Sequence, residues 1–284
     1  MERQKRVLAV HDISGVGRCS LTVALPIISA AGVECSVLPT AVLSTHTGGF
    51  TGYTCRDLTD DLLPMARHWE SLGEQFDAIY MGYLASFAQM DMMREIFSLL
   101  ADKDTLIAVD PVMGDNGKLY AAFDMTFPPA MLELCTHADL IKPNMTEAAL
   151  LLGEEYQPGP YTKEYVEGLL RRLAQKTEAR QIVLTGVYFD EERLGAATFD
   201  GTTKEIAYIF GENVPGLYHG TGDVFGSALV GALVRGMLLP EAVRAAVDFT
   251  VAAIQTTAKA GTDIRYGVNF EKNLPVYMRA LGIV

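Results

Sequence analysis

The sequence predicts an α/β fold in which a mostly parallel central sheet is covered by helices on both faces. Short apolar runs alternate with helical patterns at least five times along the 284 residues, which is the pattern of repeated strand–helix units. The short runs are apolar throughout, as expected for strands that are buried on both faces. Four of them end directly in polar residues, which is typical of the sheet edge where open α/β folds bind ligands.

The composition restricts what the chain binds. A length of 284 residues suits one large α/β domain or two smaller ones, and 49% hydrophobic residues suffice for a large core; we expect a single domain over residues 1–284. The net charge of −12 disfavours nucleic acid and anionic membranes as partners. The four cysteines form no CxxC pair, no apolar run is long enough for a bilayer, and the N-terminus lacks the pattern of a signal peptide. These features predict a cytoplasmic protein with reduced thiols.

The N-terminal elements are expected in the order strand, helix, strand, helix, at residues 7–10, 21–31, 33–38 and 57–72. Ser14 to Gly17 are predicted to form a flexible turn. Pro26 should kink the first helix or mark its true start, because proline lacks a backbone N–H. Residues 41–53 are rich in Thr and Gly with aromatic residues between them. This stretch is therefore a surface hairpin, a mobile flap over a pocket or an ordinary loop.

The rest of the chain continues the alternation. Strands are expected at residues 77–81, 105–109, 139–141 and 181–184, and helices at 90–100, 125–135, 146–152 and 165–175. Asp200-Gly201 is a strong hairpin signal between two further strands, 196–199 and 205–210. The C-terminal part is expected to be helical up to about residue 235, over 240–259, and as a helix or helical turn over 270–281.

A glycine-rich turn that opens into an apolar helix, Gly220-Thr221-Gly222-Asp223, is the most informative stretch. Glycines let the backbone approach a ligand closely, and the first amides of a helix attract anions such as phosphate. Asp223 either caps the helix or accepts a proton from a hydroxyl that attacks a phosphoryl group. The stretch lacks the Gly-Lys-Ser/Thr of a Walker A loop, and its glycines miss the dinucleotide-binding spacing.

Two polar boundaries elsewhere suit the same chemistry. Asp110 follows a buried strand and is expected at the ligand-binding edge of the sheet, although Pro111 allows it to start a turn instead. Asn144 and Glu147 have the spacing of a helix capping box, which explains both residues locally. Glu147 could also hold a magnesium ion, directly or through water.

The order of these motifs resembles that of the ribokinase-like superfamily. The motifs are Asp110-Pro-Val-Met-Gly-Asp115, Lys142-Pro-Asn-Met-Thr-Glu147, Val183-Leu-Thr-Gly186 and Gly220-Thr-Gly-Asp223. Ser44-Thr45-His46-Thr47 and Gly82-Tyr83-Leu84 are similar to stretches of the pyridoxal/pyridoxamine kinases. The resemblance spans about Val7 to Ala260. It implies a ribokinase-like three-layer sandwich with a small flap at about 41–54, and ATP-dependent phosphorylation of the 5′-hydroxymethyl group of pyridoxal, pyridoxamine or pyridoxine in vitamin B6 salvage.

The resemblance also implies site residues. Asp223 matches the general base and a substrate contact, and the amides of Gly220, Thr221 and Gly222 match the anion hole for the transferring phosphate. The positions that match contacts to ATP phosphates are Asp110, Asn144, Glu147 and Thr185, with Asp110 and Glu147 also matching the ligands of Mg²⁺. The positions expected to contact the substrate are His11, Ser14, Thr47, Tyr83 and Tyr120.

The first loop departs from the pyridoxal kinase pattern. His11 stands where those kinases carry a substrate-binding Ser, and Asp12 to Gly17 resembles the corresponding loop of hydroxymethylpyrimidine kinases. The alternatives are therefore a kinase for hydroxymethylpyrimidine or another small alcohol, and a non-catalytic protein that binds a nucleotide or pyridoxal phosphate. The resemblance further suggests a homodimer, with Phe50 and Tyr53 as exposed contacts. It leaves open the preferred vitamer, the adenine contacts and whether a monovalent cation assists.

Overall fold

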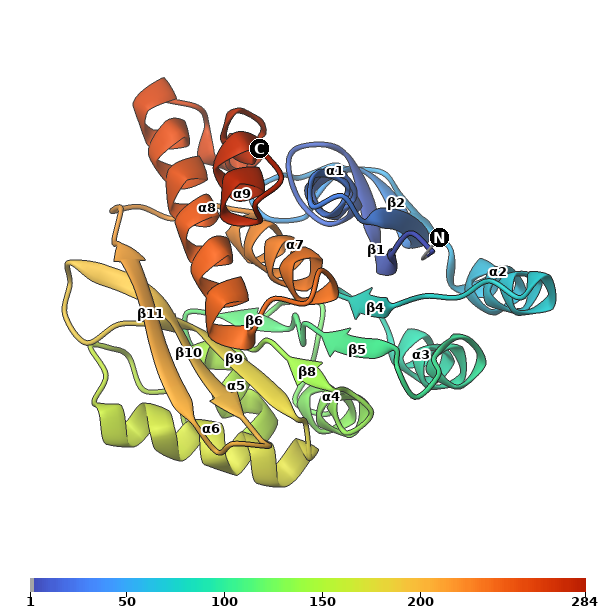
Figure 1. Ribbon diagram of the computed structural model, residues 1–284, viewed down its shortest axis with the longest axis horizontal. Helices are drawn as coiled ribbons and strands as arrows, with labels where there is room; N and C mark the ends of the chain where they lie inside the picture. The colour runs from blue at the N-terminus through green and yellow to red at the C-terminus, as the bar shows by residue number, and fades with distance from the viewer. Residues whose placement is uncertain (1–2) are drawn as a thin grey trace.

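A nine-stranded sheet forms the centre of the computed structural model, which describes residues 3–284 (Figure 1). The strand order is β11-β10-β9-β8-β5-β4-β1-β2-β3, and the six neighbouring strands from β9 to β2 are parallel. The two ends of the sheet, β9-β10-β11 and β2-β3, are antiparallel. The strands are β1 (Arg6–Val16), β2 (Glu34–Thr45), β3 (Cys55–Asp57), β4 (Ala78–Met81), β5 (Leu106–Val109), β8 (Leu140–Ile141), β9 (Gln181–Val187), β10 (Arg193–Asp200) and β11 (Ile206–Glu212).

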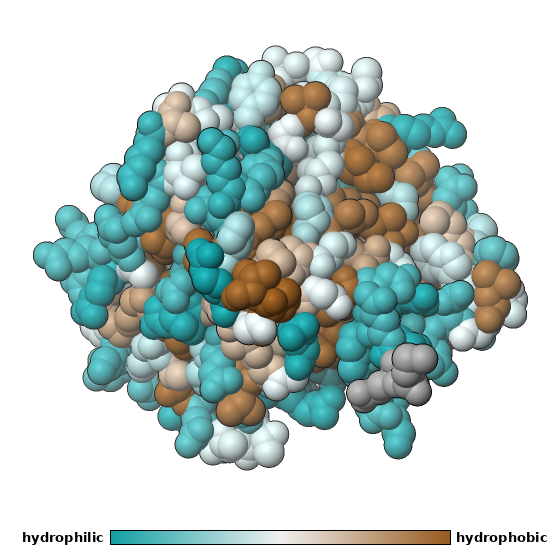
Figure 2. All heavy atoms as spheres, turned by 45° about the horizontal axis from the view of Figure 1, so that its top comes forward, coloured by the Kyte–Doolittle hydropathy of each residue, from teal (hydrophilic) through white to brown (hydrophobic). Residues whose placement is uncertain are grey.

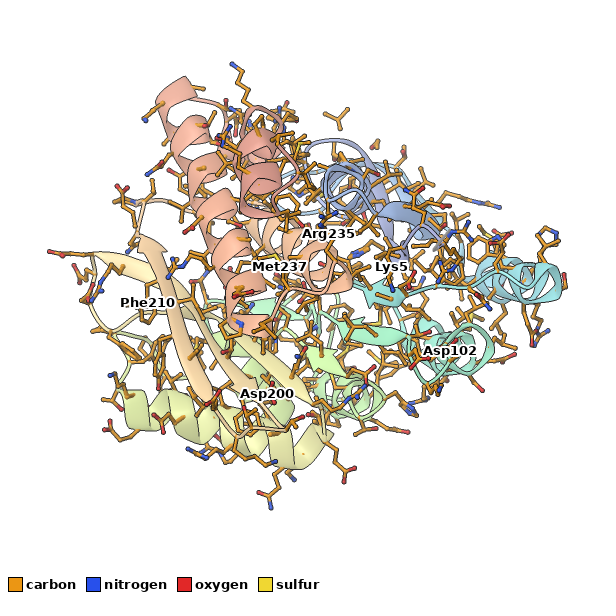
Figure 3. The ribbon with its side chains drawn as sticks, viewed as in Figure 1. Lys5, Asp102, Asp200, Phe210, Arg235 and Met237 are labelled. Carbon is orange, nitrogen blue, oxygen red and sulfur yellow. The ribbon has the colours of Figure 1, made fainter. Side chains whose placement is uncertain are left out.

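Helices cover both faces of this sheet, so the predicted three-layer sandwich is confirmed (Figure 1). One buried apolar cluster joins the sheet to α2 (Thr59–Leu72), α3 (Phe87–Leu100), α4 (Phe127–Cys135), α5 (Met145–Leu152) and α6 (Lys163–Thr177). A second cluster on the other face joins it to α1 (Leu21–Ala30), α7 (Thr221–Val234), α8 (Leu239–Ala260) and α9 (Leu274–Ala280). The Arg235 guanidinium, labelled in Figure 3, donates a hydrogen bond of 3.1 Å to the Ala31 carbonyl and so links the ends of α7 and α1.

Local sequence explains where several helices begin and end. Ser86 and Thr162 cap α3 and α6 by accepting hydrogen bonds from amides of the first turn, as short polar side chains favour. Gly73 and Gly153 end α2 and α5 in the left-handed conformation that glycine adopts without strain. The predicted helix ends at these two glycines are therefore confirmed.

Three local predictions are wrong or incomplete. The flexible turn expected from Ser14 to Gly17 is wrong for residues 14–16, which continue β1 and pair with β2 after a register shift between His11 and Ile13. Pro26 lies inside α1 and does not start it. The small hairpin of β6 (Gly114–Asp115) and β7 (Lys118–Leu119) was not expected, because two-residue strands leave no periodic pattern.

The 41–53 stretch supplies one strand and the loop of a hairpin whose second strand is β3. Its first residues, 41–45, belong to β2, and residues 41–43 pair antiparallel with β3.

Hydrophilic and hydrophobic side chains are interspersed on the face that Figure 2 shows. Within residues 3–284, no helix is both long enough and apolar enough to cross a bilayer.

Candidate active site

The carboxyl ends of the parallel strands and the start of α7 bring most of the predicted residues to one edge of the sheet. Gly220 is the residue before α7 and has the left-handed φ of 75°. A side chain at this position would overlap the carbonyl oxygen of Arg18, so the close approach of the two loops requires glycine. The first amides of α7 therefore face the site without a side-chain cap.

Asp223 lies in the first turn of α7 but does not cap it. Its Oδ2 atom accepts a hydrogen bond of 2.9 Å from the backbone amide of Ser20, which lies 203 positions earlier in the chain. Burial raises the pKa of Asp223 to about 7, and the charges of Asp110 and Asp12 add to this rise. A carboxylate that changes protonation near neutral pH, beside an anion-binding helix end, is suited to accept a proton from an alcohol. The capping explanation for Asp223 is therefore wrong.

A buried network holds the amide that contacts Asp223. Asp12 accepts hydrogen bonds from the hydroxyl groups of Ser20 at 2.6 Å and Ser14 at 3.1 Å, and all three side chains are buried. Ser20 has a φ of 53°, which residues other than glycine rarely adopt. Such strain persists only where the surroundings enforce it, and here the Asp12 hydrogen bond fixes Ser20 with its amide directed at Asp223.

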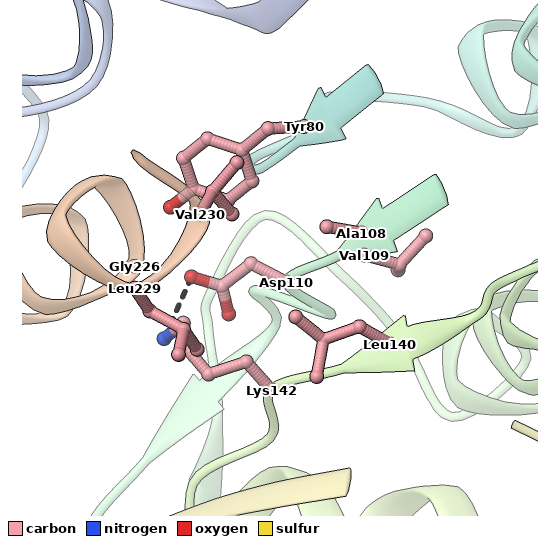
Figure 4. Close-up of a pocket in the computed structure, with 9 residues that line it drawn as sticks. All are labelled: Tyr80, Ala108, Val109, Asp110, Leu140, Lys142, Gly226, Leu229 and Val230. Carbon is pink, nitrogen blue, oxygen red and sulfur yellow. Dashed lines mark ion pairs between the residues drawn. The ribbon is translucent and has the colours of Figure 1, made fainter. Parts of the chain in front are cut away.

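Asp110 and Lys142 form a buried ion pair at the ends of β5 and β8. The Lys142 ammonium lies 2.8 Å from Asp110 Oδ2, and the two side chains are 7% and 4% exposed. Figure 4 shows them meeting beside α7, in a small cavity that is also lined by Tyr80 and Gly226. Burial raises the pKa of Asp110 although Lys142 opposes the rise, while Asp110 and Glu147 raise the pKa of Lys142 against the effect of burial.

Asn144 and Glu147 form the predicted capping box of α5. Asn144 accepts a hydrogen bond from the Glu147 amide at 2.8 Å, and Glu147 accepts one from the Asn144 amide at 2.8 Å. Glu147 also accepts a bond from the Met113 amide at 3.2 Å. Thr185 is fixed next to this box, because its amide donates to the Pro143 carbonyl at 2.9 Å. Capping thus accounts for the local geometry of Asn144 and Glu147, and it leaves lone pairs of the Glu147 carboxylate free.

Asp110 and Glu147 together fit a particular kind of metal site. Burial, with the nearby charge of Asp110, raises the pKa of Glu147 to about 8, as expected for two carboxyl groups that share a site. No group of three or more His, Cys, Asp or Glu side chains within residues 3–284 could hold a metal by itself. Magnesium is commonly held by one or two carboxylates, with water and substrate phosphates as its other ligands. The pair fits an ion of that kind.

The residues predicted to contact the substrate lie in different surroundings. Thr47 is exposed in the loop between β2 and β3, and its neighbour Gly48 packs against His219, which precedes the glycine loop. Tyr83 is half-buried and its ring centroid lies 5.8 Å from that of Phe123. Tyr120 is 40% exposed. Burial raises the pKa of its hydroxyl group, and the negative charges of Glu147, Asp110 and Asp223 add to this rise.

His11 is enclosed in the protein. The imidazole is 1% exposed and contacts Tyr80 edge-on, with ring centroids 4.6 Å apart. Neither ring nitrogen has a hydrogen-bond partner within residues 3–284. Burial lowers the pKa of His11 to about 3, and the charge of Lys142 adds to this effect, so the ring is neutral. Ser14 is also fully buried, and the roles of both residues toward a substrate stay predictions.

A short C-terminal segment packs against the hairpin loop. His46 Nε2 lies 2.5 Å from the Arg265 carbonyl, and His46 Nδ1 accepts a bond of 3.1 Å from the Gly48 amide. Phe50 packs edge-on against Tyr266 with ring centroids 5.2 Å apart. Phe50 was expected to be exposed, but this packing leaves it half-buried, whereas Tyr53 is 40% exposed.

The sequence reasoning missed three residues of the site. Asp12 and Ser20 position Asp223, and Lys142 pairs with Asp110. Lys142 follows the apolar run of β8 directly, as Asp110 follows that of β5, so the rule that singled out Asp110 also applies to it. Ser20 had no comparable signal, because its contact with Asp223 is made by the backbone.

Comparison with known proteins gives consistent matches over nearly the whole chain. A family model described as phosphomethylpyrimidine kinase matches residues 25–268. The pyridoxine/pyridoxal/pyridoxamine kinase of Bordetella bronchiseptica is 26% identical over 281 residues, with 90% of each chain covered. The pyridoxal kinase of Lactobacillus plantarum has a solved structure that is 34% identical, with a TM-score of 0.88 and 98% of each chain covered.

A second solved structure contains a vitamer. It is a Bacteroides thetaiotaomicron protein described as a phosphomethylpyrimidine kinase and crystallised with pyridoxal. It is 39% identical to this chain, with a TM-score of 0.91, and the match covers 97% of this chain and 96% of that one. The match to the family model and these two structures agree with the geometry of the site: the chain belongs to the phosphomethylpyrimidine kinase family of the ribokinase-like superfamily.

Proposed function

We propose that the protein transfers the γ-phosphoryl group of ATP to the 5′-hydroxymethyl group of pyridoxal, pyridoxamine or pyridoxine. The observation that carries the proposal is the position of Asp223. It is held by the Ser20 amide at the start of α7, beside amides that are free to bind a phosphoryl group. Its pKa of about 7 suits a general base at neutral pH. A protein that only binds a nucleotide would not need this base.

Each residue of the site has its own role in the phosphoryl transfer. The hydroxymethyl oxygen forms a bond to the γ-phosphorus while the bond to the β,γ-bridging oxygen breaks, and ADP leaves with that electron pair. Asp223 takes the proton of the hydroxyl group. The amides of Gly220, Thr221 and Gly222 stabilise the charge on the transferring group, as fixed donors do in a site that excludes water. Asn144 and Thr185 contact the ATP phosphates.

Asp110 and Glu147 would hold a magnesium ion, which neutralises part of the phosphate charge when it is bound. Thr47, Tyr83 and Tyr120 contact the vitamer, and the loop at 46–54 closes over it to exclude water. His11 and Ser14 are buried, so their predicted contacts with the vitamer require the first loop to move. We further propose that residues 1–284 act as one kinase domain, in a cytoplasmic homodimer. The ADP-release assay described below, run with and without a monovalent cation, tests whether such a cation assists the phosphoryl transfer.

One observation favours a second substrate. Asp12, Ser14 and Ser20 form a buried hydrogen-bonded group in the loop that resembles hydroxymethylpyrimidine kinases, and the matching family model carries that description. A pyrimidine alcohol is therefore the second candidate. Its phosphorylation would use Asp223 and the glycine loop in the same way.

The test is an ADP-release assay with magnesium-ATP and each of four alcohols: pyridoxal, pyridoxamine, pyridoxine and hydroxymethylpyrimidine. Turnover of the pyridine alcohols supports the first proposal and ranks the vitamers, and turnover of the pyrimidine alone supports the second. An Asp223→Asn variant serves as the control for contaminating kinases. Absence of ADP release with all four alcohols would refute both proposals.

A further inference from the structure

Lys142 is a buried cation that the roles assigned above do not use. Its side chain is 7% exposed, and Asp110 is its ion-pair partner at 2.8 Å. An ammonium group has three N–H donors, and among the described residues 3–284 Asp110 is the one carboxylate within 4.0 Å of it. A buried charge is expensive unless it is well paired, and apolar residues can often replace a buried ion pair without loss of stability. Stability alone is therefore a weak explanation for this lysine.

The Lys142 ammonium lies next to the glycine loop. A Cβ atom placed on Gly222 would be 4.0 Å from Lys142 Nζ. Farther along α7, a Cβ on Gly226 would be 3.2 Å from Lys142 Cε. The lysine stem thus runs along the first turns of α7, and its charged end lies beside Gly222 in the first turn, the end of a helix that attracts anions.

The charge balance of the site calls for such a cation. Asp110, Glu147 and Asp223 contribute up to three negative charges, and all three act on Lys142. ATP brings several more negative charges to the same place. Since charges interact strongly where water is excluded, carboxylates alone would repel the transferring phosphoryl group. Lys142 is the positive side chain that the structure brings under Gly222.

We propose that Lys142 is a catalytic residue whose ammonium donates a hydrogen bond to the transferring γ-phosphoryl group from below the glycine loop. The inference rests on the proposed kinase function and assigns it a further residue. Lys142 keeps its contact with Asp110 and directs a second N–H at the phosphoryl oxygen. It then stabilises the charge on this group during transfer, together with the amides of Gly220 to Gly222.

The test compares two nucleotides on Lys142→Met, which keeps the length of the side chain and removes its charge. Affinities for adenylyl imidodiphosphate and for ADP are measured by calorimetry in EDTA, without magnesium. A lost charge-assisted hydrogen bond to the γ-phosphoryl group should weaken binding of the triphosphate analogue about 10- to 100-fold and leave ADP binding within about twofold. In the magnesium-ATP assay, kcat should fall about 10²- to 10³-fold.

Three controls separate catalysis from folding. Lys103→Met removes a lysine that is 89% exposed and should change neither affinity. Lys142→Arg keeps the charge and should restore part of the triphosphate affinity. The double variant Asp110→Asn/Lys142→Met removes both members of the ion pair, so Asp110 is not left buried without its partner, and it keeps the test valid if Lys142→Met alone does not fold.

The inference would be overturned if Lys142→Met weakened the binding of ADP and of the triphosphate analogue equally. It would also be overturned if the double variant bound the triphosphate analogue with full affinity. Either result would mean that Lys142 only neutralises Asp110. Failure of the proposed function is distinguishable, because it appears as a wild-type protein without turnover of any of the four alcohols, and the binding comparison does not depend on the alcohol.

Discussion

Replacing Asp223 with asparagine should abolish efficient turnover and, at the same time, stabilise the fold above neutral pH. Asparagine cannot accept the hydroxyl proton, so kcat should fall about 10²- to 10⁴-fold, the usual range for a lost general base. The fold should become more stable because burial of Asp223 opposes its ionisation. Asp223 is therefore expected to be required for catalysis and, at the same time, to lower the stability of the fold above neutral pH.

The sign and size of this change in the free energy of unfolding follow from the pKa of Asp223. In the folded protein the pKa of Asp223 rises from 3.8 to about 7, so the native state holds the proton more tightly than the unfolded chain. The free energy of unfolding of the wild type therefore falls between about pH 4 and pH 7. A shift of this size corresponds to about 4 kcal/mol, and we expect ~2 kcal/mol because Asp223 is only half-buried. The asparagine side chain of the variant does not titrate and escapes this loss.

Urea unfolding of the ligand-free proteins at pH 4.5 and pH 8 measures the effect. The difference between variant and wild type should be small at pH 4.5 and should reach ~2 kcal/mol in favour of the variant at pH 8. Carboxyl groups far from Asp223 titrate alike in both proteins and cancel in the difference, which therefore reports Asp223 together with its coupling to Asp110 and Asp12. Asp104→Asn, at a side chain that is 82% exposed, is the matched control and should show no such difference. A variant with the same stability difference at both pH values, or with normal kcat, would refute the reasoning.

Three further predictions test other parts of the site. Because Asp223 must be ionised, wild-type kcat/KM should rise about tenfold per pH unit below about pH 7 and then level off; a flat profile would exclude it as the base. Gly222→Val places a branched side chain next to the Lys142 ammonium, with its Cβ 4.0 Å from Nζ, and should lose nucleotide affinity; unchanged calorimetric affinity in the folded variant would contradict the anion hole. Gly82→Ala places a methyl group on the His11 ring and should cost about 1–3 kcal/mol in urea unfolding, partly recovered by adding His11→Ala; an undiminished stability would count against this packing.

The central strands and most helices could be predicted because their pattern is local and repeated. The apolar runs of β4, β5 and β8 and the glycines after α2 and α5 lie where the sequence analysis expected them. The end of β1 could not be predicted in the same way. Ser14 and Gly15 are residue types that favour turns, but β2 supplies backbone partners that keep this segment in the sheet.

The site was predictable where a polar residue follows a buried strand or opens a helix, as for Asp110 and Asp223. It was not predictable where two distant segments meet. The hydrogen bond from the Ser20 amide to Asp223 joins residues 203 positions apart. Its donor is a backbone group, so the identity of residue 20 does not reveal it. Lys142 was overlooked because lysine is rarely buried, and only the pairing with Asp110 makes its burial tolerable.

The division of the apolar core into two clusters has a consequence for synthesis on the ribosome. The cluster with α2 to α6 is largely made of residues that follow one another from Leu62 to Phe199. The other cluster needs α1, near the start of the chain, and α7 to α9, near its end. Before α7 to α9 are synthesised, α1 can pack on β1 and β2, but the surface of α1 that contacts α7 is uncovered, and such exposed apolar surfaces favour aggregation. We therefore expect this cluster to complete its packing only after nearly the entire polypeptide is synthesised, and its long-range contacts should make it the slower of the two to form.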